Sequence, residues 1–182
     1  MYMNKTRVYT RKNYHSGNGF LTSVWGPAIW HYLHIMSFNY PVHPTQTDKR
    51  NYRKFILSLV DVLPCGKCRI NLKKNFKQLP LKMEDMESRT TFSKYIYNLH
   101  QNINKMLDKK ITLTYDEVRE RYEHFRAQCV PDIKLRKTIK NKKHDEKGCI
   151  EPLVGKKSKC VINIVPYDTK CETFNIDEKC FS

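Results

Sequence analysis

Hydrophobic residues in the first two thirds of the chain recur every three or four positions, the spacing that places them on one face of an α-helix. The periodic stretches end near Pro41, Pro64 and Pro80, where a helix cannot continue easily. This pattern predicts an all-α fold in which short loops join the helices of a bundle. The predicted helices cover residues 23–40, 47–63, 65–78, 90–110 and 114–129.

Each predicted helix has a recognisable start and one apolar face. The candidate N-caps are Ser23, Thr47 or Asp48, and Thr114, because their side-chain oxygens can accept from the first unpaired backbone N–H groups. Pro27 lies near the first turn of its helix, where proline is tolerated. The residues that we expect to face inward are Trp30, Leu33, His34 and Phe38; Tyr52, Phe55, Ile56, Leu59 and Val60; Ile70, Leu72 and Phe76; Phe92, Tyr95, Ile96, Leu99, Ile103 and Leu107; and Val118, Tyr122 and Phe125.

The last third of the chain has no helical period. A lysine-rich stretch, residues 130–148, leads to residues 149–182, where "CVINIVPY" at 160–167 favours a short strand. We therefore expect a basic lead-in over residues 1–20, a helical domain over 21–129, a linker over 130–148, and a cysteine-containing, mostly non-helical extension over 149–182.

The net charge of +16 is compatible with nucleic-acid binding but does not by itself indicate it. Its densest part, "KLRKTIKNKKHDEK", could bind nucleic acid, but a solvated linker is the interpretation we favour, because no aromatic residues are interleaved there. No apolar run approaches the roughly 18 residues that a membrane-spanning helix needs. The polar N-terminus has no signal-peptide pattern, which predicts a cytosolic protein.

The chemistry of the chain centres on "LPCGKC", in which Cys65 and Cys68 are two residues apart. A zinc site needs a second close pair of ligands, which the sequence lacks, so we predict no metal here. A thioredoxin-like motif would follow a strand, whereas this one follows a helix. The favoured interpretation is a redox dithiol at a helix N-terminus, where the macrodipole stabilises a thiolate and Lys67 and Arg69 add positive charge. Two electrons leaving a dithiol need a cofactor as acceptor.

Two predicted helices carry residues suited to such a cofactor. Gly26, Trp30 and His34 form one stripe at spacings of four, and His100 and Asn104 form another, with Lys109 beyond them. Glycine admits a flat group close to the backbone, tryptophan can stack, and histidine can form hydrogen bonds. Each stripe taken alone is also compatible with ordinary core packing.

In this order, "WGPAIWHYLH", "LPCGKC" and "HQNINKMLDKK" resemble the Erv/ALR family of FAD-linked sulfhydryl oxidases, over roughly residues 21–129 and most closely in the versions of large DNA viruses. The resemblance implies a four-helix bundle plus a short fifth helix enclosing FAD, commonly as a homodimer. It makes Cys68 the sulfur next to the flavin and Cys65 the one that exchanges with substrate. The cofactor-binding residues that it implies are Trp25, Gly26, Trp30, His34, Cys68, Tyr95, His100, Asn104, Leu107, Lys109 and Tyr122.

Two positions depart from the family pattern. Gln101 stands where the family has an asparagine, and Tyr95 where it commonly has a tryptophan. Tyrosine can still stack on a ring, so the departures bear on exact contacts with the cofactor and not on the class of protein.

The resemblance also implies a reaction and its participants. Reduced protein thiols, for example those of a thioredoxin-like or virion protein, would exchange with the disulfide, and dioxygen would be reduced to hydrogen peroxide. A viral protein of this kind would act in the host cytoplasm or the virion.

A different class of protein remains open: a basic helical protein that binds nucleic acid and holds zinc through Cys149, Cys160, Cys171 and Cys180. Within the oxidase interpretation, these cysteines could relay electrons to the CxxC pair or form structural disulfides that stabilise a small C-terminal module. We favour the structural role, because the extension has no close cysteine pair.

Overall fold

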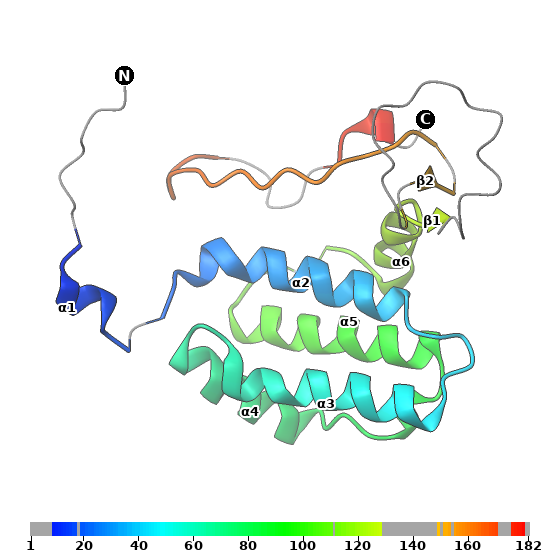
Figure 1. The fold of residues 1–182 in the computed structure, drawn as a ribbon, viewed down its shortest axis with the longest axis horizontal. Coiled ribbons are helices and arrows are strands. Elements are labelled where there is room, and N and C mark those ends of the chain that lie inside the picture. The colour runs from blue at the N-terminus through cyan, green and yellow to red at the C-terminus, as the bar shows by residue number, and fades with distance from the viewer. Residues whose placement is uncertain are drawn as a thin grey trace.

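The computed structural model describes residues 9–17, 19–110, 112–128, 149, 151–153, 155–170 and 176–180. Four long helices form a bundle, and a shorter helix packs beside it (Figure 1). The bundle helices are α2 (Thr22–Phe38), α3 (Gln46–Val62), α4 (Gly66–Gln78) and α5 (Arg89–Met106), followed by α6 (Tyr115–Glu123). The minor elements are α1 (Arg11–Tyr14), η1 (Glu84–Met86), β1 (Ala127–Gln128), β2 (Glu151–Pro152) and η3 (Glu178–Cys180).

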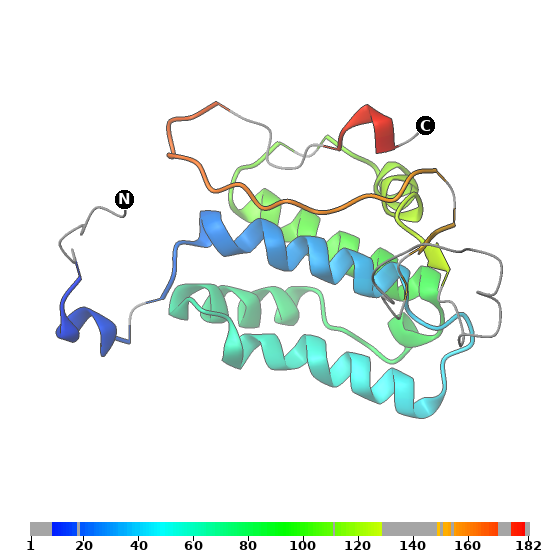
Figure 2. The same ribbon diagram turned by 45° about the horizontal axis from the view of Figure 1, so that its top comes forward.

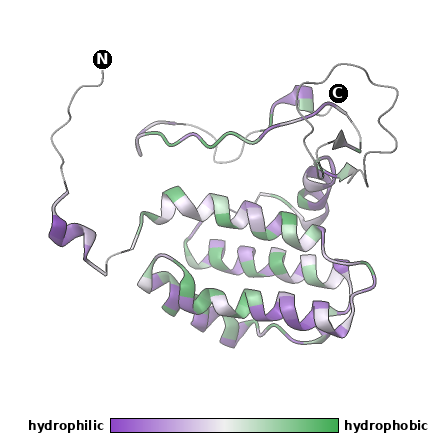
Figure 3. Ribbon diagram, viewed as in Figure 1, coloured by the Kyte–Doolittle hydropathy of each residue, from purple (hydrophilic) through white to green (hydrophobic). Residues whose placement is uncertain are grey.

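The arrangement agrees with the predicted bundle plus a fifth helix. The helices α2 and α5 pack against each other, as do α3 and α4, and the second pair lies below the first in Figure 2. The short helix α1, in the predicted lead-in, stands away from the bundle and is hydrophilic, whereas the bundle helices carry hydrophobic and hydrophilic residues in alternating groups (Figure 3). None of the described helices has the length and apolar character needed to cross a membrane.

The core lies where the apolar faces of the four helices meet. Most of the predicted inward residues are there, but three are not: Ile70 is 58% exposed on α4, Leu107 is 50% exposed at the end of α5, and Phe55 is 38% exposed on α3. Tyr40 is fully buried, and its hydroxyl donates to the carbonyl of Met86 at 2.9 Å, so η1 is held against the core. The buried apolar cluster consists of Leu33, Tyr40, Ile56, Leu59, Leu72, Leu81, Met86, Phe92, Tyr95, Ile96 and Leu99.

The starts of two helices differ from the prediction. The helix α3 is capped by Thr45 and not by Thr47 or Asp48: Asp48 N–H donates to Thr45 Oγ1, and Thr45 N–H donates to the Asp48 carboxylate. This reciprocal pair satisfies two backbone donors, which neither predicted cap could do. The helix α2 begins at Thr22 without a side-chain cap, so Ser23 lies inside its first turn. The prediction of Thr114 as a cap is confirmed.

We predict that Thr45→Ala lowers the free energy of unfolding by about 1 kcal/mol, because the first turn of α3 loses its cap. Thr47→Ala is the matched control and should change it by a few tenths of a kcal/mol, since Thr47 Oγ1 only accepts from the exposed Arg50. Urea denaturation of the three proteins measures both values. Equal losses in the two variants would contradict the role of Thr45.

The predicted strand at 160–167 is wrong. Its apolar side chains are exposed except for the half-buried Val165, and its described residues form no ladder with another segment. A strand needs a partner for its backbone groups, and Pro166 lacks an N–H to offer. The described strands are instead β1 and β2, which pair antiparallel with Ala127 opposite Pro152. Cys129, Cys171 and the linker at 130–148 lie outside the described residues.

Candidate functional site

Cys65 and Cys68 form a disulfide at the start of α4. Cys65 is the N-cap of the helix, and the backbone N–H of Cys68 donates to its sulfur at 3.2 Å. Both residues are partly exposed, so a substrate can approach the pair. A sulfur that caps a helix is stabilised as a thiolate by the unpaired N–H groups and the macrodipole. In this structure that direct N–H contact belongs to Cys65.

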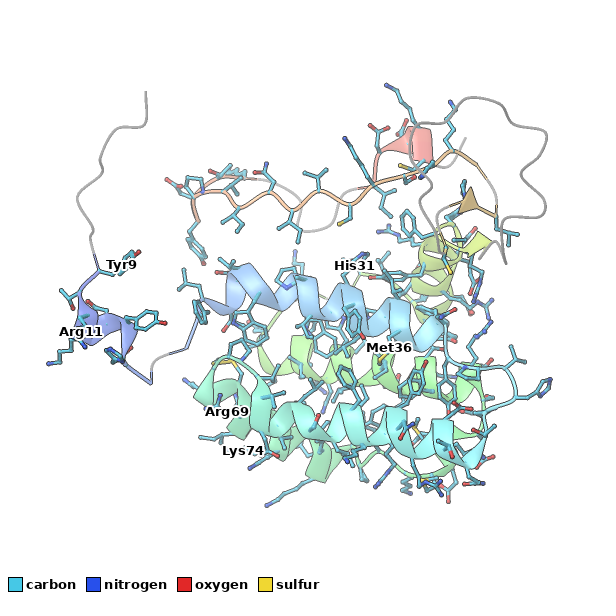
Figure 4. All side chains as sticks on the ribbon, in the orientation of Figure 1. Tyr9, Arg11, His31, Met36, Arg69 and Lys74 are labelled. Atoms are coloured by element: carbon cyan, nitrogen blue, oxygen red, sulfur yellow. A yellow bond between two sulfur atoms is a disulfide. The ribbon has the colours of Figure 1, made fainter. Side chains whose placement is uncertain are left out.

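The two cationic side chains of the motif, Lys67 and Arg69, differ in their contacts and exposure. The guanidinium of Arg69 donates to the carbonyl of Leu63, at the end of α3. Lys67 is exposed to solvent. Figure 4 places Arg69 at the end of the bundle where α4 begins and α2 starts. The predicted positive charge is therefore present beside the pair, and Arg69 also ties the motif to the preceding helix.

The predicted stripes on α2 and α5 meet in the bundle. Trp30 stacks on His100, with ring centroids 4.0 Å apart and ring planes 7° apart. His34 Nε2 and His100 Nδ1 lie 3.0 Å apart and share a hydrogen bond. Tyr122, from α6, stacks on His34 with centroids 5.4 Å apart. Residues from three helices thus form one aromatic group, which we call the His34 cluster: Trp30, His34, His100 and Tyr122.

Burial keeps the histidines of this cluster neutral. Loss of solvation, followed by the nearby His100 and His31, lowers the pKa of His34 to about 3. Burial, followed by the charge of Lys109, lowers the pKa of His100 to about 4. Burial also raises the pKa of the Tyr122 hydroxyl. At neutral pH the cluster is therefore uncharged, and each neutral imidazole offers one N–H donor and one acceptor nitrogen.

One buried polar atom of the cluster, His34 Nδ1, lacks a hydrogen-bond partner among the described residues. His34 is 4% exposed, and its Nδ1 forms no hydrogen bond with any of the described residues. A buried polar atom without a partner is costly, and native proteins rarely keep one. Gly26 lies on the same face of α2, and an added Cβ there would meet only Thr22 Cγ2, at 3.6 Å. An apolar, aromatic face with one unpaired nitrogen fits a planar heterocycle such as a flavin.

The end of α5 gathers three more predicted residues. Asp108 adopts a left-handed conformation with φ of 52°, which turns the chain so that Lys109 N–H donates to the carbonyl of Asn104 at 2.9 Å. Leu107 is the C-cap residue of this turn. The charge of Lys109 is near enough to His100 to affect its pKa. Asn104 and Leu107 thus belong to the turn that ends α5, and Lys109 is the residue of this turn whose charge acts on His100.

Two predicted residues lie apart from the cluster. Tyr95 is buried in the core, 3% exposed, and its hydroxyl donates to the carbonyl of Leu79 at 2.9 Å. Trp25 is in the first turn of α2, and its Nε1 donates to the carbonyl of Phe20 at 3.1 Å. The structure therefore brings together Trp30, His34, His100 and Tyr122, and it gives Tyr95 and Trp25 contacts elsewhere.

Sequence reasoning missed His31 and Phe38. His31 Nδ1 lies 3.3 Å from the Tyr122 hydroxyl, and Phe38 stacks on both His34 and Tyr122. Phe38 was predicted only as core. His31 lies three residues before His34, and this helical spacing is the signal that could have identified it.

Comparisons with known proteins identify similar sequences and structures. The model of the Erv1/Alr family matches residues 27–123. A probable FAD-linked sulfhydryl oxidase of Acanthamoeba polyphaga mimivirus is 39% identical over 99 residues, which cover 54% of this chain and 68% of that protein. An FAD-linked sulfhydryl oxidase of African swine fever virus is 30% identical and is covered to 80%, with 54% of this chain.

The fold has a counterpart among solved structures. The crystal structure of the yeast Erv1 core superposes with a TM-score of 0.52 at 21% sequence identity, covering 67% of this chain and 96% of that one. This likeness concerns the fold alone.

Proposed function

The chain belongs to the Erv1/Alr family, and from this membership we infer that it is an FAD-linked sulfhydryl oxidase that forms disulfides in protein substrates. The relatives of mimivirus and African swine fever virus are named for this activity. The observation that carries the proposal is the Cys65–Cys68 disulfide at the start of α4, in a bundle that also holds the His34 cluster.

Thiol exchange at the disulfide follows from the position of the two sulfurs. A substrate thiolate attacks Cys65 Sγ, the Cys65–Cys68 bond breaks, and a mixed disulfide forms between substrate and Cys65. A second substrate thiol resolves the mixed disulfide and leaves the pair reduced. Bound FAD supplies the two-electron acceptor for the dithiol and, through dioxygen as terminal acceptor, hydrogen peroxide as product.

The chain's own residues hold and orient the cofactor. We propose that Trp30, His34, His100 and Tyr122 contact its rings, with His34 Nδ1 gaining the partner that it lacks among the described residues. Gly26 leaves space at the α2 backbone, and Lys109 contributes a positive charge. The full set that we assign to FAD is Trp25, Gly26, Trp30, His34, Cys68, Tyr95, His100, Asn104, Leu107, Lys109 and Tyr122.

The substrates, the place of action and the assembly are proposed only as general classes. We propose reduced protein thiols as substrates, the host cytoplasm or virion as the place of action, and a homodimer as the assembly. An exposed apolar face supports the dimer: Tyr32 of α2 and Phe55 of α3 contact each other edge to face while both stay exposed. Aromatic side chains are enriched in the cores of protein interfaces.

The competing zinc-binding interpretation of the C-terminal extension has less support. Cys149 is disulfide-bonded and therefore not available as a thiolate ligand. Among the described residues, no three histidine, cysteine or acidic side chains are grouped so that they could hold a metal ion.

We expect the purified protein to be yellow, with absorption at about 450 nm from bound oxidised flavin. It should also consume oxygen when dithiothreitol is added. Absorbance and an oxygen electrode measure both properties. The double variant Cys65→Ser/Cys68→Ser is the control and should keep the colour but lose the oxygen consumption. A folded, colourless protein that takes up no FAD on reconstitution would refute the proposal.

A further inference from the structure

The segment before α2 is docked on the turn that carries the disulfide. Phe20 N–H donates to the carbonyl of Pro64 at 2.9 Å, and the Phe20 carbonyl accepts from Trp25 Nε1. Gly19 has no space for a side chain, since an added Cβ would lie 2.3 Å from Pro64 O and 2.9 Å from the Cα of Cys65. Only glycine fits this close approach of two backbones.

This docking brings a hydroxyl to one of the two sulfurs. Thr22 Oγ1 lies 3.6 Å from Cys68 Sγ, which is within hydrogen-bond distance for sulfur. A disulfide sulfur carries no hydrogen, so the threonine hydroxyl must be the donor. Each sulfur of the pair therefore has its own donor: the backbone N–H of Cys68 for Cys65, and the Thr22 hydroxyl for Cys68.

We propose that Thr22 is a positioning residue that stabilises the Cys68 thiolate and so accelerates its departure when a substrate thiolate attacks Cys65. The proposal rests on the thiol exchange assigned above. When a substrate thiolate attacks Cys65 Sγ, a new S–S bond forms to the substrate and the Cys65–Cys68 bond breaks. The bonding electron pair stays on Cys68 Sγ, which leaves as a thiolate, while the substrate sulfur is oxidised to the disulfide level. Thr22 keeps its proton and donates a hydrogen bond to the leaving sulfur.

The effect on exchange follows from leaving-group chemistry. A thiol of lower pKa leaves faster, so the Thr22 donor on Cys68 accelerates attack on Cys65, whereas the N–H contact of Cys65 acts on the opposite reaction, attack on Cys68. Hydrogen bonds to a charged form favour that form, although Thr22 is exposed and water competes for its hydroxyl. We therefore expect the hydrogen bond to lower the pKa of the Cys68 thiol by about half a unit to one unit, a factor of roughly three to ten in its acid dissociation constant.

The test measures the Cys68 thiol directly in the full-length Cys65→Ala protein. The rate of alkylation of the Cys68 peptide by iodoacetamide, followed by mass spectrometry from pH 5 to 10, gives its pKa. Thr22→Val, which removes the hydroxyl at nearly constant shape, should raise the pKa by about half a unit to one unit. Thr22→Ser should keep the wild-type value, because it restores the donor. Ser23→Ala, one residue along the same helix, is the control and should have no effect.

A second pair of variants tests the docking. Gly19→Ala should raise the Cys68 pKa as Thr22→Val does, since the new methyl group pushes the segment off Pro64. Gly17→Ala is the matched control, because an added Cβ at Gly17 meets nothing within 4 Å. In the Cys68→Ala background, Thr22→Val should leave the reactivity of Cys65 unchanged.

Two results would overturn the proposal: no shift of the Cys68 pKa in Thr22→Val, or an equal shift of Cys65. Alkylation requires no turnover of the enzyme and no flavin chemistry. A failure of this inference is therefore distinguishable from a failure of the oxidase activity, which the oxygen-consumption assay reports separately.

Discussion

Cys68→Ser is expected to keep FAD bound and to abolish the reduction of the flavin by any thiol. The side chain is small and partly exposed, so the substitution leaves the core of the bundle intact. Without the second sulfur, a substrate thiol meets no disulfide, and its electrons have no route through the pair. Anaerobic mixing with dithiothreitol, followed by absorbance near 450 nm (about the flavin maximum), measures the loss. Turnover should fall to the background of the flavin alone.

Cys65→Ser should also stop turnover but with a different spectrum. It leaves Cys68 as a free thiol that keeps its contact with Thr22. If Cys68 is the sulfur next to the flavin, its thiolate should give a long-wavelength charge-transfer band at pH values above the thiol pKa. The band should fade as the pH falls through that pKa. If the band appears in Cys68→Ser and not in Cys65→Ser, the roles of the two sulfurs are reversed.

The helices were predictable because their apolar stripes are strong and regular. Ile56, Leu59, Phe92 and Leu99 lie on the buried faces that their spacing indicates. The cap of α3 was less predictable, because "TQTD" offers two threonines and only the three-residue spacing from Thr45 to Asp48 forms a capping box. The sequence therefore indicates the elements better than their first residues.

The contacts of the site depend on the tertiary fold to different degrees. Cys65 and Cys68 are close in sequence, so their disulfide and the N-cap could be predicted locally. The contact of Thr22 with Cys68 joins residues 46 positions apart, and that of His31 with Tyr122 joins residues 91 apart. No local period marks such pairs. The expected strand at 160–167 failed for a related reason, since strand formation depends on a partner that the local pattern does not specify.

The neutral histidines of the bundle make stability depend on pH. The ordinary pKa of histidine is 6.5, whereas burial lowers that of His34 to about 3 and that of His100 to about 4, the latter also under the charge of Lys109. Between pH 6.5 and 4 the unfolded chain binds protons that the folded chain does not bind. The stability that this difference contributes is therefore fully present above pH 6.5 and is lost as the pH falls toward 4.

Lowering the pH from 7 to 5 should reduce the free energy of unfolding by about 2 kcal/mol for each of these two histidines, or about 4 kcal/mol together. Urea denaturation at both pH values, at matched FAD occupancy, measures the loss. His100→Asn should remove about half of the difference between the two pH values, whatever it does to stability at pH 7. His43→Asn, at an exposed position outside the cluster, is the control and should keep the wild-type difference. An unchanged difference in His100→Asn would mean that this imidazole is already protonated in the folded protein at pH 5, contrary to its burial against Trp30 and His34.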